Sequence, residues 1–171
     1  MEYWDLLDIN RQPMGKTQLR GQPMEEGEYH IVVEIWTVND NNEVLLTLRH
    51  PDKPYAYHWE ATAGSILTGE TSAQGAVREL FEETGIAASE HELHLLGTYR
   101  EKSAFVDTYI LRRNTKLSEV VLQEGETIDA KWVTLSVLDQ LISEGAIASP
   151  NIRRLSAVRT QFEAYISGRA L

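Results

Sequence analysis

The 171-residue sequence contains no cysteine. Disulfide bonds, thiolate metal sites and thiol nucleophiles are therefore excluded. The sequence also lacks a run of the roughly 20 apolar residues that a membrane-spanning helix requires. Its first residues, Met1–Asp5, carry acids where a secretory signal would carry basic residues. We therefore expect a cytoplasmic protein that does not act at a membrane.

Basic residues are scarce, since 16 Lys and Arg stand against 26 Asp and Glu and give a formal net charge of -10. A chain of this charge is repelled by nucleic-acid backbones and anionic membranes, so neither is expected as the main partner. An enzyme of small phosphorylated substrates can still be acidic, because bound divalent cations reverse the sign of the charge locally. A soluble acidic surface without any such role is the alternative.

The hydrophobic pattern indicates one domain over residues 1–171, without internal repeats or linkers. Residues 1–28 are expected to form a short hairpin extension. Strands are predicted at residues 31–38, 43–49, 93–100, 104–112 and 128–135, with a tight turn at residues 40–42. Helices are predicted at residues 71–84 and from Ser149-Pro150 onward, with Ser149 as N-cap. Between them, a helix with Leu138, Leu141 and Ile142 on one face is expected to stop at Gly145. Strands and helices mixed in this way favour an α/β (α+β) fold in which helices cover a sheet.

The first of these helices has clear end signals and one acidic face. Thr71 and Gln74 have the spacing of a capping box, and Gly85 suits the left-handed residue after a helix. Glu79, Glu82 and Glu83 stand at i, i+3 and i+4 and share one face, where their repulsion costs a few tenths of a kcal/mol per pair. A hard cation such as Mg²⁺ would relieve this repulsion, because it prefers oxygen ligands. A solvated acidic face is the alternative.

The spacing around this helix is more specific than its charge. Gly64 is followed after five residues by Glu70, and after seven more by Arg78-Glu79-Leu80-x-Glu82-Glu83-x-Gly85-Ile86. This segment, residues 64–86, resembles the Nudix box, G-x5-E-x7-R-E-U-x-E-E-x-G-U with U aliphatic, at every specified position. A chance match in a chain of this length has odds below about one in a million. The resemblance implies the Nudix fold, an α/β/α sandwich with a mixed β-sheet, in which the box forms a strand, a loop and a helix.

The resemblance also implies the roles of individual residues. The expected ligands of Mg²⁺ or Mn²⁺ are Glu79, Glu82, Glu83 and the Gly64 carbonyl. Glu82 and Glu83 would take part in catalysis, and Arg78 would orient the glutamates rather than touch the substrate. Glu70 would have a supporting role. The activity implied is the metal-dependent hydrolysis of a pyrophosphate bond by water.

Nudix enzymes often take a general base from outside the box or from its last glutamate. The loop 119–129 offers Glu126 as the first candidate, because this residue lies just before a predicted strand. Glu124 is the second candidate, and Glu119 and Asp129 are further acids of the same loop. For each of them, a solvated acidic side chain is the alternative.

The segment 49–59 combines cations with aromatic residues directly before the box. We expect Arg49 and Lys53 to bind phosphates and Tyr55 or Tyr57 to stack on a base. The substrate predicted is a small nucleotide-type diphosphate, such as a nucleoside di- or triphosphate or a nucleoside diphosphate-linked compound, with no particular base. Trp36 and Trp59 are expected in the core. Many Nudix proteins dimerise, so a homodimer is compatible with the sequence.

The N-terminal half is similar to Nudix proteins related to isopentenyl diphosphate isomerase, through segments 5–8, 15–21 and 27–30. Those enzymes have a cysteine where this chain has Ala63 and a histidine ligand where it has Ser65. Isomerase activity is therefore not expected, and His30 is interpreted as a hydrogen-bonded residue at a strand end. A Nudix domain that binds a nucleotide without cleaving it is the remaining alternative, but such domains usually lose box glutamates.

Overall fold

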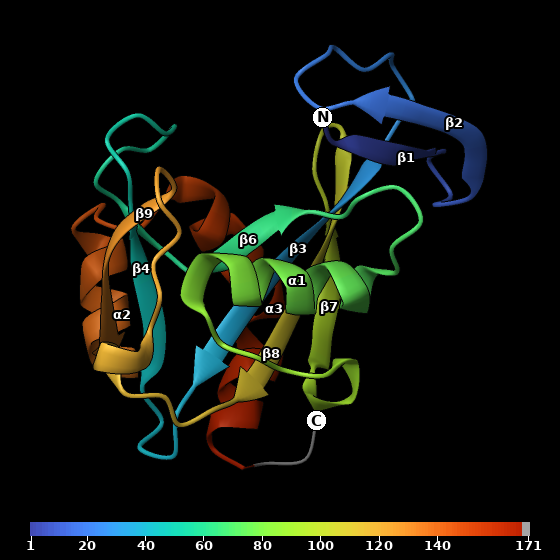
Figure 1. Cartoon of the computed structure of the whole chain (residues 1–171). Coiled ribbons are helices and arrows are strands. Elements are labelled where there is room, and N and C mark those ends of the chain that lie inside the picture. Colours follow the sequence, from blue (N-terminus) through green and yellow to red (C-terminus); the bar gives the residue numbers. More distant parts are fainter. Residues whose placement is uncertain (169–171) are drawn as a thin grey trace.

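The computed structural model describes residues 1–168 (Figure 1); the last three residues of the expected domain 1–171 lie outside this part. The strands within it are β1 (Tyr3–Leu7), β2 (Pro13–Leu19), β3 (His30–Val38), β4 (Val44–Arg49), β5 (Trp59–Glu60), β6 (Thr62–Ser65), β7 (His94–Arg100), β8 (Ala104–Arg112) and β9 (Thr127–Val133). The helices are α1 (Ser72–Thr84), α2 (Leu135–Ser143) and α3 (Ser149–Ile166), with short 3₁₀ turns at Glu90–Glu92 and Leu117–Glu119. The longer predicted strands and all three predicted helices are confirmed; β5 and β6 were not predicted by the pattern.

The main sheet has the order β5-β4-β3-β8-β7, with β6 paired to β3 and β9 paired to β4. The pair β3–β8 is parallel and the other pairs are antiparallel, so the sheet is mixed. The hairpin expected from β3 and β4 pairs only beside its turn, at Val38 and Val44. Beyond that point β3 pairs with β6, and β4 pairs with β5 and β9. The opening between β3 and β4 lets β6 bring Gly64 into the sheet.

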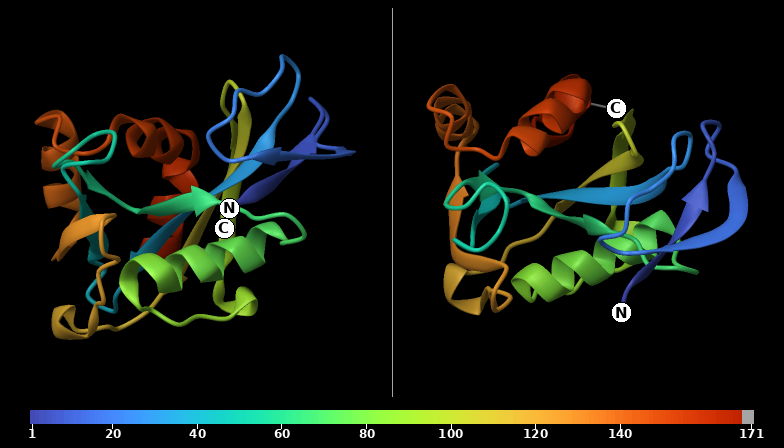
Figure 2. Two further views of the ribbon diagram at one scale, coloured as in Figure 1. Left: turned by 45° about the horizontal axis from the view of Figure 1, so that its top comes forward. Right: turned by 90° about the horizontal axis from the view of Figure 1, so that it is seen from above.

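Helices cover both faces of this sheet, which confirms the α/β/α sandwich (Figure 2). On one face α1 buries Ala76 and Leu80 against Val33 and Ile35 of β3. On the other face α2 and α3 cover a cluster centred on Trp36, as expected for this residue. Because successive residues of β3 point to opposite faces, one strand supplies both layers of the core.

The ends of α1 are fixed by the residues that the sequence indicated. The Thr71 hydroxyl accepts a hydrogen bond from the Gln74 N–H at 3.1 Å, and the Gln74 side chain accepts one from the Thr71 N–H at 2.9 Å. Gly85 ends the helix with φ 70°. Gly75 lets the helix pack closely on the loop before it, because a Cβ at this position would lie 2.5 Å from Cγ2 of Ile66. The glutamates of α1 are therefore held in a fixed orientation relative to β6.

The start of α3 differs by one residue from the expectation. Ala148 is the N-cap, and Ser149 and Pro150 are already helical. The reason is that the Ala148 N–H donates to the Trp59 carbonyl oxygen at 2.9 Å, while the Ala148 carbonyl accepts the N–H of Ile152. The first turn of α3 is thereby tied to β5, close to the box.

The N-terminal segment forms a separate two-stranded sheet of β1 and β2, which lies beside the body of the protein (Figure 1). Arg11 donates two hydrogen bonds to the buried Asp107 of β8, at 2.8 and 2.5 Å. The Tyr3 carbonyl accepts a hydrogen bond from the N–H of Thr68, in the loop of the box, at 2.9 Å. The hairpin is therefore anchored at both ends, and β1 lies against the box. Among the helices of residues 1–168, none combines the length and the apolar character that crossing a bilayer requires.

Candidate active site

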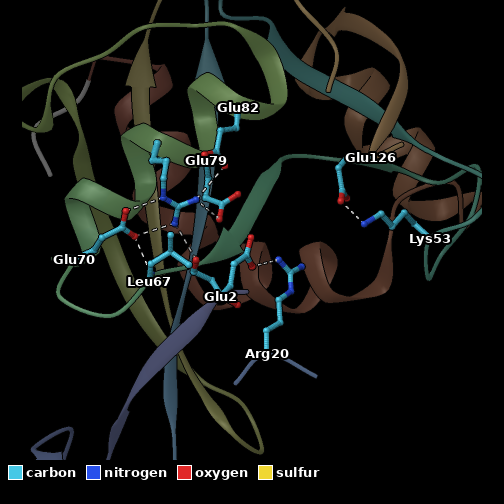
Figure 3. A network of polar contacts seen from close by, with 10 residues as sticks. Glu2, Arg20, Lys53, Leu67, Glu70, Glu79, Glu82 and Glu126 are labelled. Carbon is cyan, nitrogen blue, oxygen red and sulfur yellow. Dashed lines mark hydrogen bonds and ion pairs between the residues drawn. The ribbon is translucent and has the colours of Figure 1, made fainter. Parts of the chain in front are cut away.

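Arg78 organises the acidic side chains of the box through all five of its N–H donors. It donates to both carboxylate oxygens of Glu70, at 2.7 and 2.9 Å, and to the Ser65 carbonyl at 3.1 Å. It also donates to Glu79 at 2.9 Å and to Glu82 at 3.1 Å. We call Glu70, Arg78, Glu79 and Glu82 the arginine cluster; its three glutamates are labelled in Figure 3. Because all five N–H groups are used in this way, Arg78 has no donor left for a substrate.

Glu79 lies directly on the backbone of β6. Its carboxylate fills the space beside Gly64 where any other residue would place a Cβ, so a side chain there would collide with it. The Glu79 side chain is only 13% exposed. Burial raises the pKa of this carboxyl, and the hydrogen bond from Arg78 opposes the rise. The structure thus brings together Gly64 and Glu79, two of the expected metal-binding positions.

Glu83 is buried and incompletely paired. In the part of the chain that the structure describes, its Oε2 atom has no hydrogen-bond partner. Burial raises the pKa of Glu83 well above its usual range, and the charges of Glu60, Glu79 and Glu126 raise it further. An unpartnered buried carboxylate oxygen is costly, which indicates a group that completes its contacts with something else. Glu82 is more accessible, with 43% of its side chain exposed.

The carboxylates do not form a ready-made metal cluster: within residues 1–168, no three acidic or histidine side chains converge closely enough to hold an ion. Arg78 takes one oxygen of Glu79 and one of Glu82 and leaves the second oxygen of each. Together with the unpartnered oxygen of Glu83, these hard oxygen donors fit Mg²⁺ or Mn²⁺ chemically.

A pocket of ≈ 250 Å³ opens on the side of β6 toward the start of α3. Its lining residues are Arg20, Val32, Arg49, Pro54, Tyr55, Glu60, Ala63, Gly64, Ser65, Ala148, Pro150, Asn151 and Arg154. Of the four residues expected to bind substrate, Arg49 and Tyr55 line this pocket, whereas Lys53 and Tyr57 do not. Gly64, which belongs to this lining, is also the residue that contacts the Glu79 carboxylate.

Arg49 is held in place by two hydrogen bonds. Its Nε–H donates to the Pro54 carbonyl at 2.6 Å, and its Nη1 donates to Glu60 at 2.5 Å. Burial raises the pKa of Glu60, and the charge of Arg49 opposes the rise. Sequence reasoning missed Glu60, although a lone acid within the apolar segment 59–63 was a signal that could have identified it.

Two residues of the pocket lining, Asn151 and Arg154, contact a buried carboxylate. Glu34 of β3 accepts hydrogen bonds from Trp36 Nε1 at 2.8 Å and from Asn151 Nδ2 at 2.9 Å, and Arg154 lies 3.6 Å away. Burial raises the pKa of Glu34 to about 7, although these partners oppose the rise. Asn151 and Arg154 reach the pocket from α3 and were not identified from sequence.

Of the four acids considered for the general base, Glu126 is the one whose charge contributes to the raised pKa of Glu83. It forms an ion pair with Lys53 across from the arginine cluster (Figure 3). Its backbone carbonyl accepts a hydrogen bond from the His50 N–H at 2.8 Å, which joins the two loops. Glu124 and Asp129 are exposed.

His30 and Trp59 are not among the residues that line the pocket. His30 begins β3 and stacks on Trp4 at 4.0 Å, but its Nδ1 has no hydrogen-bond partner within residues 1–168. The hydrogen bond expected of His30 is therefore not found at Nδ1, and stacking takes its place. Burial lowers the pKa of His30 to about 4. Trp59 packs against the core, as expected.

The sandwich fold and the carboxylates of α1 define a class of protein, and comparison of the chain with known proteins identifies this class. The chain matches the family model of the NUDIX domain over residues 28–155. It is 37% identical to an uncharacterised Nudix hydrolase of Listeria monocytogenes over 147 residues, which cover 85% of this chain and 87% of that protein. The chain is a member of the Nudix hydrolase family, whose enzymes generally use divalent metal ions.

Solved structures agree on the fold. A Deinococcus radiodurans protein superposes with a TM-score of 0.70 at 21% identity, over 86% of this chain and 92% of that one. The NUDIX domain of Shewanella oneidensis NrtR, complexed with ADP ribose, superposes with a TM-score of 0.62 at 19% identity, over 78% of this chain and 88% of that one.

Proposed function

We propose that this Nudix hydrolase is a metal-dependent pyrophosphohydrolase of a nucleoside di- or triphosphate or of a nucleoside diphosphate-linked compound. The observation that carries this proposal is the position of Gly64. This residue contacts the Glu79 carboxylate on one side and lines the Arg49 pocket on the other. A diphosphate bound by Arg49 would therefore lie next to the carboxylates that are suited to hold a divalent ion.

Each residue of the site has a distinct part in this proposal. Glu79, Glu82, Glu83 and the Gly64 carbonyl would hold Mg²⁺ or Mn²⁺, which when bound neutralises phosphate oxygens and favours the loss of a proton from water. Arg49 would bind phosphate oxygens through the donors that Pro54 and Glu60 leave over. Arg78 would keep Glu79 and Glu82 in position.

The substrate class is supported by the small size of the pocket and by Tyr55 in its lining, because an aromatic ring can stack on a base. The ADP ribose bound to the NUDIX domain of NrtR is a compound of this class. The pocket also argues against isomerase chemistry. Ala63 and Ser65 line it where the isomerases have their cysteine and histidine.

The proposal is tested by phosphate and pyrophosphate release from a panel of nucleoside diphosphates, nucleoside triphosphates and diphosphate-linked sugars. We expect turnover that requires Mg²⁺ or Mn²⁺ and is about 10- to 100-fold lower in Glu82→Gln, because the variant loses a charged ligand. Glu163→Gln is the matched control, since Glu163 is also 43% exposed and also pairs with an arginine at i,i+4, outside the site. Tight binding of a nucleotide without turnover under any metal would instead make the protein a sensor.

For Glu126 we propose the role of general base, which accepts a proton from the attacking water. Glu126→Gln is expected to lower kcat by about 100-fold with little change in KM, because the base acts in the chemical step. Glu124→Gln, two residues away and exposed, serves as the comparison. If Glu124→Gln loses activity and Glu126→Gln does not, Glu124 is the base. If both variants keep full activity, the base is a glutamate of the box.

A further inference from the structure

The N-terminal hairpin contributes a cation to the pocket from outside the family domain. Arg20 follows the last residue of β2 and lines the pocket together with Arg49 and Gly64. The family model begins only at residue 28, so the hairpin is additional to the matched domain. In Figure 3 the pair Glu2–Arg20 projects toward the region between Glu79 and the Glu126–Lys53 pair. Arg20 also lies close enough to Glu79 and Glu126 for both charges to raise its pKa, after the larger effect of Glu2.

The cations around the site differ in how many donors they keep free. Arg78 uses all five in the arginine cluster. Arg154 is 11% exposed and is bound to Glu101 and Glu34, and Lys53 is paired with Glu126. Arg20 has one side-chain hydrogen bond within residues 1–168, from Nη1 to Glu2. Of the arginines that line the pocket, Arg20 therefore has the most donors left for a ligand.

The one partner of Arg20 is easily displaced. Glu2 belongs to the same hairpin, where its carbonyl also accepts a hydrogen bond from the Arg20 N–H at 3.0 Å. The side chains of Arg20 and Glu2 are 56% and 47% exposed, and an ion pair between exposed groups is weak in water. A phosphate carries more charge than one carboxylate and offers a guanidinium two parallel hydrogen bonds.

We propose that Arg20 binds the phosphate oxygens of the substrate, and that Glu2 competes with the substrate for this guanidinium. The inference rests on the proposed function for its ligand class, a diphosphate. It assigns to the hairpin a direct part in substrate binding. It also predicts opposite effects for the two members of one ion pair, which a purely structural ion pair would not produce.

The test is the binding of methylenediphosphonate, whose P–C–P linkage cannot be hydrolysed, measured by calorimetry on the full chain with Mg²⁺. Arg20→Met is expected to raise Kd about 10-fold, because a charged bidentate contact is lost. Arg20→Lys should fall between Arg20→Met and the unaltered protein. Glu2→Gln should lower Kd about 2- to 5-fold, because the competing charge is removed. Lys16→Met is the matched control, since Lys16 is on the same hairpin, is 54% exposed and pairs with Glu28 away from the pocket.

Thermal melting of each variant checks that the hairpin is still folded. The inference is overturned if Arg20→Met binds as Lys16→Met does, if Glu2→Gln weakens binding as Arg20→Met does, or if the unaltered protein does not bind the probe. Because the probe requires no turnover, the two proposals fail separately. A protein that hydrolyses nothing in the panel but shows the expected order of Kd values would refute only the hydrolase, whereas turnover with unchanged binding in Arg20→Met would refute only the role of Arg20.

Discussion

Glu83→Gln is expected to lower kcat by about three orders of magnitude while it raises the stability of the metal-free protein. The loss of activity follows because a charged metal ligand is worth several kcal/mol in the transition state, at about 1.4 kcal/mol for each tenfold change. The gain in stability follows because Glu83 is buried close to the charges of Glu60 and Glu79, whereas the amide of glutamine has no charge to bury. Removing such a charge should raise the free energy of unfolding by about 1–3 kcal/mol. Phosphate release and denaturant unfolding in EDTA measure the two effects.

The stability gained in Glu83→Gln should depend on pH. The pKa of Glu83 is raised in the folded protein, first by burial, so the folded state binds this proton more tightly than the unfolded chain does. This contribution stabilises the fold at low pH and is lost as the pH rises from the unfolded pKa through the folded one. The stability gained in Glu83→Gln should therefore be larger at pH 8 than at pH 5. A variant that is less stable than the unaltered protein at both pH values would contradict this account.

The geometry of the box could be predicted from sequence because it is local. In an α-helix the spacing i, i+3, i+4 determines which side chains share a face, and the capping residues fix where the helix begins and ends. Thr71, Gln74 and Gly85 did so for α1. Arg78 was expected to orient the glutamates, and it donates four hydrogen bonds to Glu70, Glu79 and Glu82, while its role stays a prediction. Its donation to the Ser65 carbonyl could not be predicted, because it depends on how α1 packs against β6.

The pocket could be predicted only in part, because its lining comes from elements that are far apart in the sequence. Arg20, Glu60 and Asn151 meet there through the docking of the hairpin, the short strand β5 and the start of α3. The loop before the box shows a second limit. Tyr55 and Tyr57 both have a positive φ, of 58° and 60°, which side chains other than glycine rarely adopt. Such a loop cannot be derived from residue types, and in it Tyr57 is 64% exposed and lies outside the pocket lining.

Gly64→Ala is expected to weaken Mn²⁺ binding by about 10- to 100-fold and to lower kcat on the order of 100-fold. The cause is a single methyl group. A Cβ at residue 64 would collide with the carboxylate of Glu79, which must then leave its position on β6. The φ angle of Gly64 is not positive, so alanine fits the backbone and the effect acts through Glu79. Calorimetric titration with Mn²⁺ and phosphate release measure the two changes.

Gly97→Ala separates this effect from the general cost of a methyl group in the sheet. Gly97 of β7 also lacks a positive φ, and its Cβ would meet only Cγ1 of Val158, at 3.0 Å. The added methyl should lower the free energy of unfolding by about 1 kcal/mol through overpacking and leave Mn²⁺ affinity unchanged. If Gly64→Ala binds Mn²⁺ as tightly as Gly97→Ala does, Glu79 is not a ligand. Gly64 would then not link the pocket to a metal site.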